Sequence, residues 1–355
     1  MKRLARTLAA FAAHRLRFAD LPYALHRLVR GQYVVAAFVY HRIVDSRATA
    51  SFYTDYERGL DTGIFSRHLD VLTRHFHMVD LDTFLAIVSG RRPAETHSAL
   101  LTFDDADAGF IDYALPELRR RDIPAAIMAP VQLIGTADQF WHVRVSNAIR
   151  HADDRHWDEI VRRAGEWPAP VAAVVRRYSA LPPPARRRPL ARAVNLALDQ
   201  VHHDDIDRLL AAWQRLIAPA APVPVYCMDW EALRYLERHR IAIESHTLSH
   251  RKLPYLSDEE IACELSQSKL TLEEKLGKRV RAVAYPQGRY ERRIGDAARA
   301  AGYEAGFTTV RLPCRYPLAP ENMFALPRLD LGGETYRELE FHLAKAGTRW
   351  IRQTP

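Results

Sequence analysis

The sequence has little cysteine and no long apolar run. Its three cysteines, Cys227, Cys263 and Cys314, lie far apart among 355 residues and form no C-x-x-C pair. An odd number of dispersed thiols is not a disulfide framework, so we expect a reduced compartment. No stretch approaches the roughly eighteen consecutive apolar residues that a membrane-spanning helix needs. The sequence therefore predicts neither disulfides nor a spanning helix.

The N-terminus lacks a secretory signal as well. Such a signal needs an apolar core of about seven to fifteen residues and a small-residue cleavage site. The apolar run over residues 8–13 is too short for that, and His14 and Arg15 follow it directly. We therefore expect a cytoplasmic protein.

Acidic residues are scarce near the N-terminus, where positive charge is concentrated. The net charge is +8, and residues 1–30 hold seven Lys or Arg and a single acid. The apolar residues Leu4, Leu8, Phe11 and Phe18 share one helical face among these bases. This pattern suits peripheral contact with an anionic membrane, but an amphipathic helix packed on the rest of the protein explains it more simply. Because no stacking aromatics are interleaved with the bases, we expect no nucleic-acid partner.

Short apolar runs alternate with helical patterns in two parts of the chain. Runs of about four to eight apolar residues that end at a sharp polar break are typical of buried parallel strands. They lie at residues 33–40, 99–103, 124–129, 241–244, 280–285, 305–309 and 325–331. Their alternation with helices predicts a parallel sheet or barrel with right-handed crossovers. About seven or eight strands suit a barrel better than an open sheet.

The alternation is interrupted over residues 136–225. This stretch is rich in Arg and Ala, has helical periodicity and contains no good strand, and prolines mark its joints. We therefore predict an α/β protein with a helical insertion and a basic helical N-terminal extension. Its parts are the extension at 1–32, the first half of the α/β domain at 33–135, the insertion at 136–225, and the second half with the C-terminal tail at 226–355.

Two adjacent carboxylates, Asp104 and Asp105, end the apolar run at residues 99–103. Neighbouring side chains point different ways off an extended backbone. One acid can therefore hold a cation while the other handles a proton. The alternative is a helix N-cap followed by an acid in the first turn.

Two histidines follow another predicted strand, which ends at Glu244. His246 and His250 are four residues apart, so we expect both imidazoles on the same side of a helical turn. The carboxyl ends of parallel strands lie at one edge, which brings this pair to the acids. Asp105 with the two histidines would leave positions open for water and substrate on a divalent ion. The alternative is a pair of surface histidines.

These motifs, in this order, resemble the polysaccharide deacetylases, the NodB-homology group of carbohydrate esterase family 4. The matching segments are residues 102–105 for T-F-D-D, 246–250 for H-[ST]-x-x-H, and, for one branch of the family, 285–288 for Y-P-x-G and 40–43 for Y-H-R-[IV]. The similarity covers residues 33–135 and 226–331, so the extension and the insertion lie outside it.

The resemblance implies a distorted (β/α)7 barrel and metal-dependent removal of acetyl groups from N-acetylated sugars. It also implies that Asp104 is the general base. The implied ligands of the divalent ion are Asp105, His246 and His250. Zinc is the first choice of metal, with cobalt, nickel or manganese as alternatives. The implied partner is an N-acetylated glycan in polymeric, oligosaccharide or lipid-linked form.

The general acid is less clear from the motifs. Many members of the family take it from a late L-x-H-x motif, and the tail of this chain offers His342 in a helix-like setting. The branch that includes the exopolysaccharide poly-N-acetylglucosamine deacetylases takes it from the first strand, where this chain has His41. A histidine is a suitable donor to a leaving amine near neutral pH. The resemblance therefore implies His41 as general acid, and the alternative is a structural histidine at the rim.

The groups around the base also depart from the common pattern. Ala284 replaces the Arg that usually precedes the proline turn. Arg328, at another strand end, is a candidate to take over its role, and the alternative is a salt bridge with Asp330. A developing oxyanion needs a preorganised N–H, which the turn near Gln287 could supply. Tyr285, Gln287 and Arg328 are therefore the candidates for substrate or oxyanion binding.

Two other functions fit the same motifs. A catalytically silent carbohydrate-binding protein could keep this fold, although the intact acids and histidines argue against it. A deacylase or amidohydrolase of a non-sugar amide would need the same water-activating groups. The motifs themselves do not separate that enzyme from a sugar deacetylase.

Overall fold

Two units of the chain fold around separate apolar cores. The computed structural model describes residues 33–45, 59–179, 183–217, 227–332 and 339. The barrel unit contains the described residues up to 45, those from 59 to 134 and those from 227 onward, and the second unit contains those from 135 to 217. The expected basic extension and its membrane contact lie outside the described residues, as does His342. Within the described ranges, no helix has the length and apolarity to cross a bilayer.

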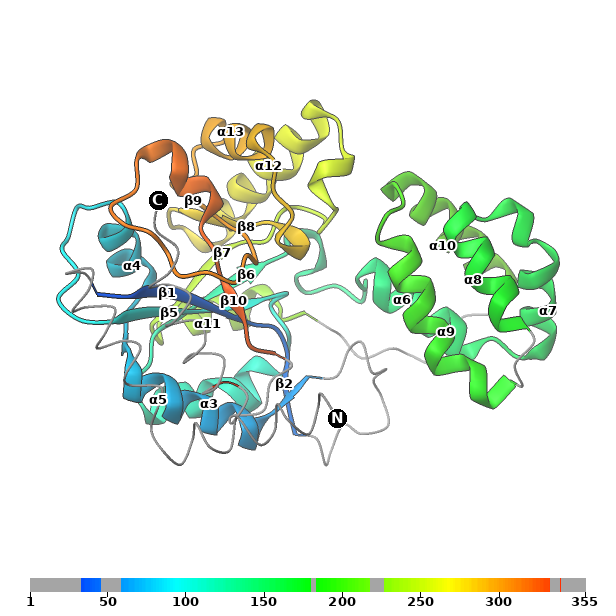
Figure 1. The fold of residues 1–355 in the computed structure, drawn as a ribbon, viewed down its shortest axis with the longest axis horizontal. Helices are drawn as coiled ribbons and strands as arrows, with labels where there is room; N and C mark the ends of the chain where they lie inside the picture. The colour runs from blue at the N-terminus through cyan, green and yellow to red at the C-terminus, as the bar shows by residue number, and fades with distance from the viewer. Residues whose placement is uncertain (1–32, 46–58, 180–182, 218–226, 333–338, 340–355) are drawn as a thin grey trace. The chain divides into compact units, whose positions relative to one another are not determined.

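Parallel strands form the centre of the barrel unit (Figure 1). Their bounds are Val35–Tyr40 (β1), Ser98–Asp104 (β5), Ala125–Ala129 (β6), Ile241–Ser245 (β7), Ala282–Ala284 (β8), Ala305–Phe307 (β9) and Leu329–Asp330 (β10). In the described part of the chain these seven strands lie in the order β10, β1, β5, β6, β7, β8 and β9, and every neighbouring pair is parallel. The short strand β4 (His77–Met78) also pairs with β5. A separate pair is formed by β2 (Ile43–Val44) and β3 (Leu60–Asp61).

The path of the strands closes on itself. Leu326 forms a parallel bridge with Phe307 of β9, and β10 then pairs with Phe38 and Val39 of β1. The residues of β1 and β5 are all buried, as expected for parallel strands that are covered on both faces. The predicted distorted (β/α)7 barrel is confirmed.

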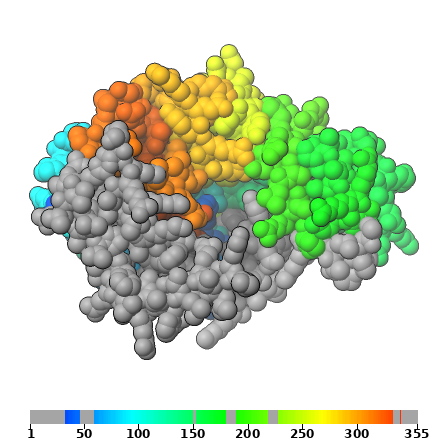
Figure 2. Space-filling model, in the orientation of Figure 1, coloured from blue at the N-terminus to red at the C-terminus, as the bar shows by residue number. Residues whose placement is uncertain are grey.

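Helices cover the outside of these strands (Figure 1). They are α3 (Thr62–His75), α4 (Leu81–Val88), α5 (Leu115–Arg120), α11 (Trp230–Glu237), α12 (Asp258–Leu276) and α13 (Arg292–Ala300). Short helical turns are η1 (Phe110–Ala114), η2 (Val131–Leu133), η4 (Leu253–Tyr255), η5 (Pro286–Gly288) and η6 (Pro320–Ala325). On the face drawn in Figure 2, α12, α13 and the segment after β9 form the yellow-to-orange surface of the barrel unit.

Both ends of α12 are set by local sequence. The Ser257 side chain accepts the N–H of Glu260, and the Glu260 carboxylate accepts the N–H of Ser257, so the two form a capping box. At the other end Gly277 has a φ of 67°, the left-handed conformation that terminates helices. The helix buries Ile261 and Leu265 against the barrel.

The regular elements of the second unit are all helices within its described residues. Its elements are α6 (Trp141–His151), α7 (Asp154–Arg162), η3 (Ala164–Glu166), α8 (Ala169–Ser179), α9 (Pro183–Leu198) and α10 (His203–Leu216). Trp157, Trp167 and Trp213 lie in its core, where the rings of Trp167 and Trp213 meet edge to face at 6.3 Å. The unit therefore has a core of its own.

Candidate active site

Residues with reactive side chains stand where the barrel strands end. His41 follows β1, Asp104 ends β5, His246 follows β7 and Tyr285 follows β8. Because β5, β6 and β7 are neighbouring parallel strands, their carboxyl ends lie at one edge of the barrel. This edge brings together segments that are about 140 residues apart in the sequence.

Asp105, His246 and His250 bring three ligand atoms together. Asp105 Oδ1 lies 3.6 Å from His246 Nε2 and 3.5 Å from His250 Nε2. The other ring nitrogen of His246, Nδ1, lies 2.7 Å from the carbonyl oxygen of Ala284, which directs Nε2 toward the carboxylate. The ligand atoms of the three residues lie within 4.8 Å of one another, the one such group among the described His, Cys, Asp and Glu side chains.

The chemistry of this donor set fits a divalent cation. Asp105 Oδ1 is buried and has no hydrogen-bond partner among the described residues. Burial raises the pKa of Asp105, and the nearby His41 and His246 oppose this only in part. A cation between the carboxylate and the imidazoles would supply the missing stabilisation. Two histidine nitrogens and one carboxylate also leave coordination positions open, as in catalytic zinc sites.

Arg328 forms a two-pronged ion pair with Asp104. Its Nη1 and Nη2 atoms lie 2.7 Å and 2.8 Å from the two carboxylate oxygens. It also donates to Thr102 Oγ1 at 3.0 Å and to the carbonyl of Thr308 at 3.1 Å. The side chain is 0% exposed, and the expected role of Arg328 in substrate or oxyanion binding stays a prediction. The structure places Arg328 beside Asp104 and not against Asp330.

This pairing decides the charge of Asp104. Burial by itself would raise the pKa of its carboxyl group, but Arg328, His246 and His41 hold that pKa at about 2. Asp104 is therefore ionised at neutral pH although it is buried.

His41 lies at the same edge as the acids. The residue is exposed directly after β1. It is close enough to both carboxyl groups that its positive charge lowers the pKa of Asp104 and of Asp105. His41 is therefore an exposed imidazole near both Asp104 and Asp105.

The proline turn carries Tyr285 and Gln287, two of the candidates for substrate or oxyanion binding. This residue is buried; its hydroxyl donates to the carbonyl of Phe324 at 3.0 Å, and its N–H donates to the carbonyl of Phe307 at 3.0 Å. Both polar groups are used inside the barrel, and the expected substrate or oxyanion role of Tyr285 stays a prediction. Gln287 is exposed and has a left-handed φ of 59°.

The two imidazoles do not lie on a helical turn, contrary to the expectation from their spacing. Residues 246–250 form an irregular loop, with left-handed φ values of 66° at Thr247 and 58° at His250. The carboxylate of Glu264, which belongs to α12, accepts two backbone N–H groups of this loop. Glu264 was not predicted from the sequence. The feature that could have indicated it is an acidic residue next to Leu265, on the apolar stripe of α12.

Left-handed backbone is concentrated around the site. Besides the two positions in the histidine loop, it occurs at Asp105 (74°), Ala106 (50°) and Gln287 (59°). Residues other than glycine seldom adopt this conformation, and it persists where the surrounding structure enforces it. The loops that carry the candidate ligands are therefore held in specific conformations.

A second ion pair next to the site also escaped sequence reasoning. Arg42 Nε lies 3.5 Å from Asp107 Oδ2, and both side chains are largely buried. Burial raises the pKa of Asp107 to about 6, against the opposing charge of Arg42. The pair ties the segment that carries His41 to the one that carries Asp105. The sequence feature that could have indicated this ion pair is Asp107, the third acid of the run D-D-A-D.

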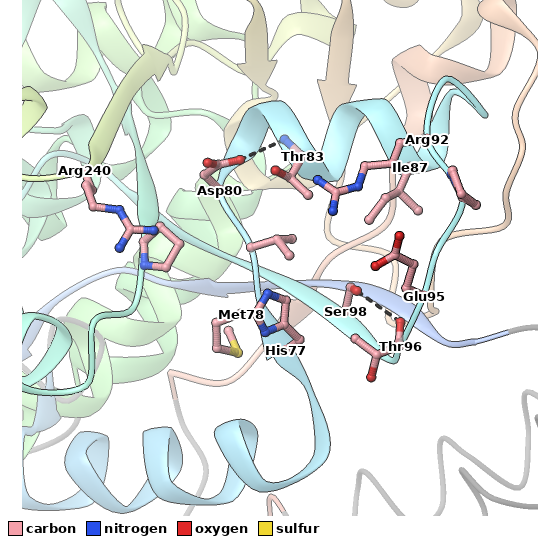
Figure 3. A pocket seen from close by; sticks show the side chains of 13 residues that line it. His77, Met78, Asp80, Thr83, Ile87, Arg92, Glu95, Thr96, Ser98 and Arg240 are labelled. Carbon is pink, nitrogen blue, oxygen red and sulfur yellow. Dashed lines mark hydrogen bonds between the residues drawn. The ribbon is translucent and has the colours of Figure 1, made fainter.

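A cavity of about 380 Å³ lies at the opposite end of the strands (Figure 3). Residues at or just before the start of strands line it, among them His77, Ser98 and Pro124. Arg92 and Arg240 approach it from opposite sides (Figure 3). None of the predicted site residues lines this cavity, so it is separate from the candidate active site.

Comparison with known sequences points to one family. The sequence model of the polysaccharide deacetylases matches residues 204–306. Over 79 residues the chain is 33% identical to a protein of Bacillus subtilis (strain 168) named "Putative polysaccharide deacetylase YxkH". That match covers 22% of this chain and 28% of the relative, so the chain spans less than a third of the relative's length.

Solved structures show the same fold. The Streptococcus pyogenes deacetylase PplD in complex with acetate has a TM-score of 0.53 at 16% identity, covering 87% of this chain and 97% of that one. IcaB from Ammonifex degensii has a TM-score of 0.55 at 15% identity, covering 88% and 97%. BC0361, a polysaccharide deacetylase from Bacillus cereus, has a TM-score of 0.54 at 13% identity, covering 88% and 69%. The resemblance to the polysaccharide deacetylases that the sequence shows is confirmed over the matched residues, and the solved structures confirm the fold.

Proposed function

We propose that the chain is a metal-dependent hydrolase that removes N-acetyl groups from an amino-sugar polysaccharide, an oligosaccharide or a lipid-linked glycan. The observation that carries the proposal is the convergence of Asp105, His246 and His250 next to the ionised carboxylate of Asp104. The related proteins are polysaccharide deacetylases by name, which supports an acetylated glycan as the substrate class.

Each residue of the site has a separate role in the proposed reaction. A divalent ion held by Asp105 and the two histidines, with zinc as the first choice, would lower the pKa of a bound water and polarise the amide carbonyl. Asp104 accepts the proton of the attacking water, because it is ionised and its Oδ2 lies 3.9 Å from His246 Nε2, beside the donor set. Arg328 fixes the orientation of this carboxylate through its two hydrogen bonds.

The second half of the reaction needs a proton donor. The nitrogen of the amide leaves as an amine only when it is protonated. His41 supplies this proton, since it is the exposed imidazole next to both carboxyl groups. The backbone N–H of Gln287 is the candidate donor to the oxyanion that forms at the carbonyl.

Removing the metal is expected to abolish acetate release. The assay measures acetate released from N-acetylglucosamine oligomers and from lipid-linked N-acetyl sugars before chelation, after chelation, and after zinc is restored. His250→Ala should bind zinc weakly because it leaves two ligands. The matched control is His77→Ala, which removes an exposed histidine at the opposite end of the strands. Acetate release that persists in metal-free protein contradicts the proposal.

His41→Gln is expected to lower kcat on N-acetyl sugars by roughly 10²- to 10⁴-fold, the usual contribution of a general acid. The loss concerns protonation of the leaving nitrogen, so 4-nitrophenyl acetate, whose leaving group needs no proton, should be hydrolysed with a much smaller loss. Bound zinc should be unchanged, because His41 is not among the candidate ligands. An equal loss on amide and ester would indicate a structural histidine instead.

A further inference from the structure

Helix α12 carries two buried polar side chains, Glu264 and Ser268, on the face that packs against the barrel. They are four residues apart, so they lie one turn apart on the same side of the helix. A buried carboxylate is costly unless hydrogen bonds satisfy it. The reaction proposed above uses neither residue.

Both side chains bind the segment that carries His246. Glu264 Oε2 accepts the N–H of Leu248 at 3.0 Å and that of Ser249 at 2.9 Å, and its other oxygen accepts the Ser249 hydroxyl. On the other side of the histidine, the hydroxyl of Ser245 donates to Ser268 Oγ at 3.0 Å. The helix thus holds this segment both before and after His246.

The histidine loop has no helical hydrogen bonds to fix its shape. Two of its N–H groups are satisfied from within the segment: that of Thr247 by Ser245 Oγ at 3.2 Å, and that of His250 by Thr247 Oγ1 at 3.2 Å. The two N–H groups between them are those that Glu264 accepts. One carboxylate of α12 therefore completes the backbone hydrogen bonding between the two candidate ligands.

We infer that Glu264 is a positioning residue that fixes His250 relative to His246 and so prearranges the donor set for a divalent ion. The inference rests on the proposed function, because it assigns Glu264 a task at the same site. Glu264 touches no candidate ligand side chain in its hydrogen bonds; it acts through the backbone that precedes His250. Such outer contacts orient metal ligands and affect metal affinity.

The test is the zinc affinity of the full chain, measured by competition with a chromogenic chelator. Glu264→Ala leaves two backbone N–H groups without their acceptor, and its zinc affinity should fall by about 10- to 100-fold. Glu264→Gln keeps an oxygen that can accept both N–H groups, and its amide group can face the Ser249 hydroxyl. This conservative variant should therefore restore most of the affinity, and the absorption spectrum of the cobalt-substituted protein should follow the same order.

The matched control lies on the same helix. Glu273 accepts the N–H of Val280 at 2.9 Å and pairs with Lys269, and it makes no contact with the histidine loop in the described structure. Glu273→Ala removes a carboxylate of the same kind, so it should lower thermal stability without changing zinc affinity. An equal loss of zinc affinity in both variants, or wild-type affinity in folded Glu264→Ala, overturns the inference.

A wild-type chain that binds no zinc would contradict the proposed function. Hydrogen exchange in metal-free protein then decides the inference by itself. The amides of Leu248 and Ser249 should exchange faster in Glu264→Ala than in wild type and in Glu273→Ala. Unchanged exchange at these two amides overturns the role assigned to Glu264.

Discussion

An Asp104→Asn variant is expected to lose a factor on the order of 10² to 10⁴ in kcat for acetate release while it still binds zinc. Asparagine has the shape of aspartate but cannot take a proton from water. The candidate ligands Asp105, His246 and His250 stay in place, so metal binding should survive. The measurement is kcat on N-acetylglucosamine oligomers, together with the zinc content of the same preparation.

Asp330→Asn is the matched control for this experiment. It neutralises an acid at the end of β10 whose carboxylate accepts the N–H of Gly332 at 2.9 Å, and kcat should stay at the wild-type level. A wild-type kcat in Asp104→Asn would assign proton removal to another group. A wild-type chain that binds N-acetylated glycans without releasing acetate would instead favour the catalytically silent carbohydrate-binding protein.

The barrel could be predicted because each strand is a short apolar run with a distinct end. A parallel strand buried on both faces is mostly apolar, and β5 shows this at Ala99, Leu100, Leu101 and Phe103 before it ends at Asp104. The same reasoning placed Asp104 and His246 at one edge, because chemistry collects where parallel strands end. The barrel fold and the positions of Asp104 and His246 could therefore be predicted from local sequence patterns.

Contacts between distant segments could not be predicted in this way. Arg328 had an acid two residues away, at Asp330, yet it pairs with Asp104, which is 224 residues away. Tyr285 matches a motif, but its ring points into the barrel. The ring lies so close to Gly306 that a Cβ added to this glycine would be 2.0 Å from the Tyr285 hydroxyl oxygen. Only the register of the closed barrel decides such pairings. Spacing likewise suggested a helical turn between the histidines. The structure differs because the acceptor for the backbone N–H groups of that loop is Glu264, which comes from α12.

Arg328→Met is expected to lower the free energy of unfolding near neutral pH by about 3–5 kcal/mol. Breaking a buried ion pair leaves the remaining charge, here that of Asp104, uncompensated. Methionine fills much of the space of arginine but donates no hydrogen bond, so Thr102 and Thr308 also lose a partner. Urea unfolding of metal-free protein measures the loss.

The dependence of this loss on pH separates an unpaired charge from lost packing. In the wild type the pKa of Asp104 is about 2 in the folded state, below the usual 3.8. The ionised carboxylate therefore stabilises the fold above the usual value, and this contribution disappears as the pH falls toward 2. In Arg328→Met burial is less opposed and raises the pKa of Asp104, so the folded variant binds a proton that the unfolded chain has released. The stability difference should therefore be smaller near about pH 4 than near about pH 7.

The double variant Asp104→Asn/Arg328→Met removes both charges from the same buried position. It should be more stable than Arg328→Met near neutral pH, because no uncompensated charge remains in the barrel. Its stability relative to the Asp104→Asn single variant should also change less between the two pH values, since neither variant has a carboxyl group at this position and only the smaller effect of Arg328 on Asp105 remains. A double variant no more stable than Arg328→Met, with a loss that does not change with pH, would show that packing around Arg328 dominates. In that case the ionisation of Asp104 would depend on His246 and His41, the other two charges that lower its pKa.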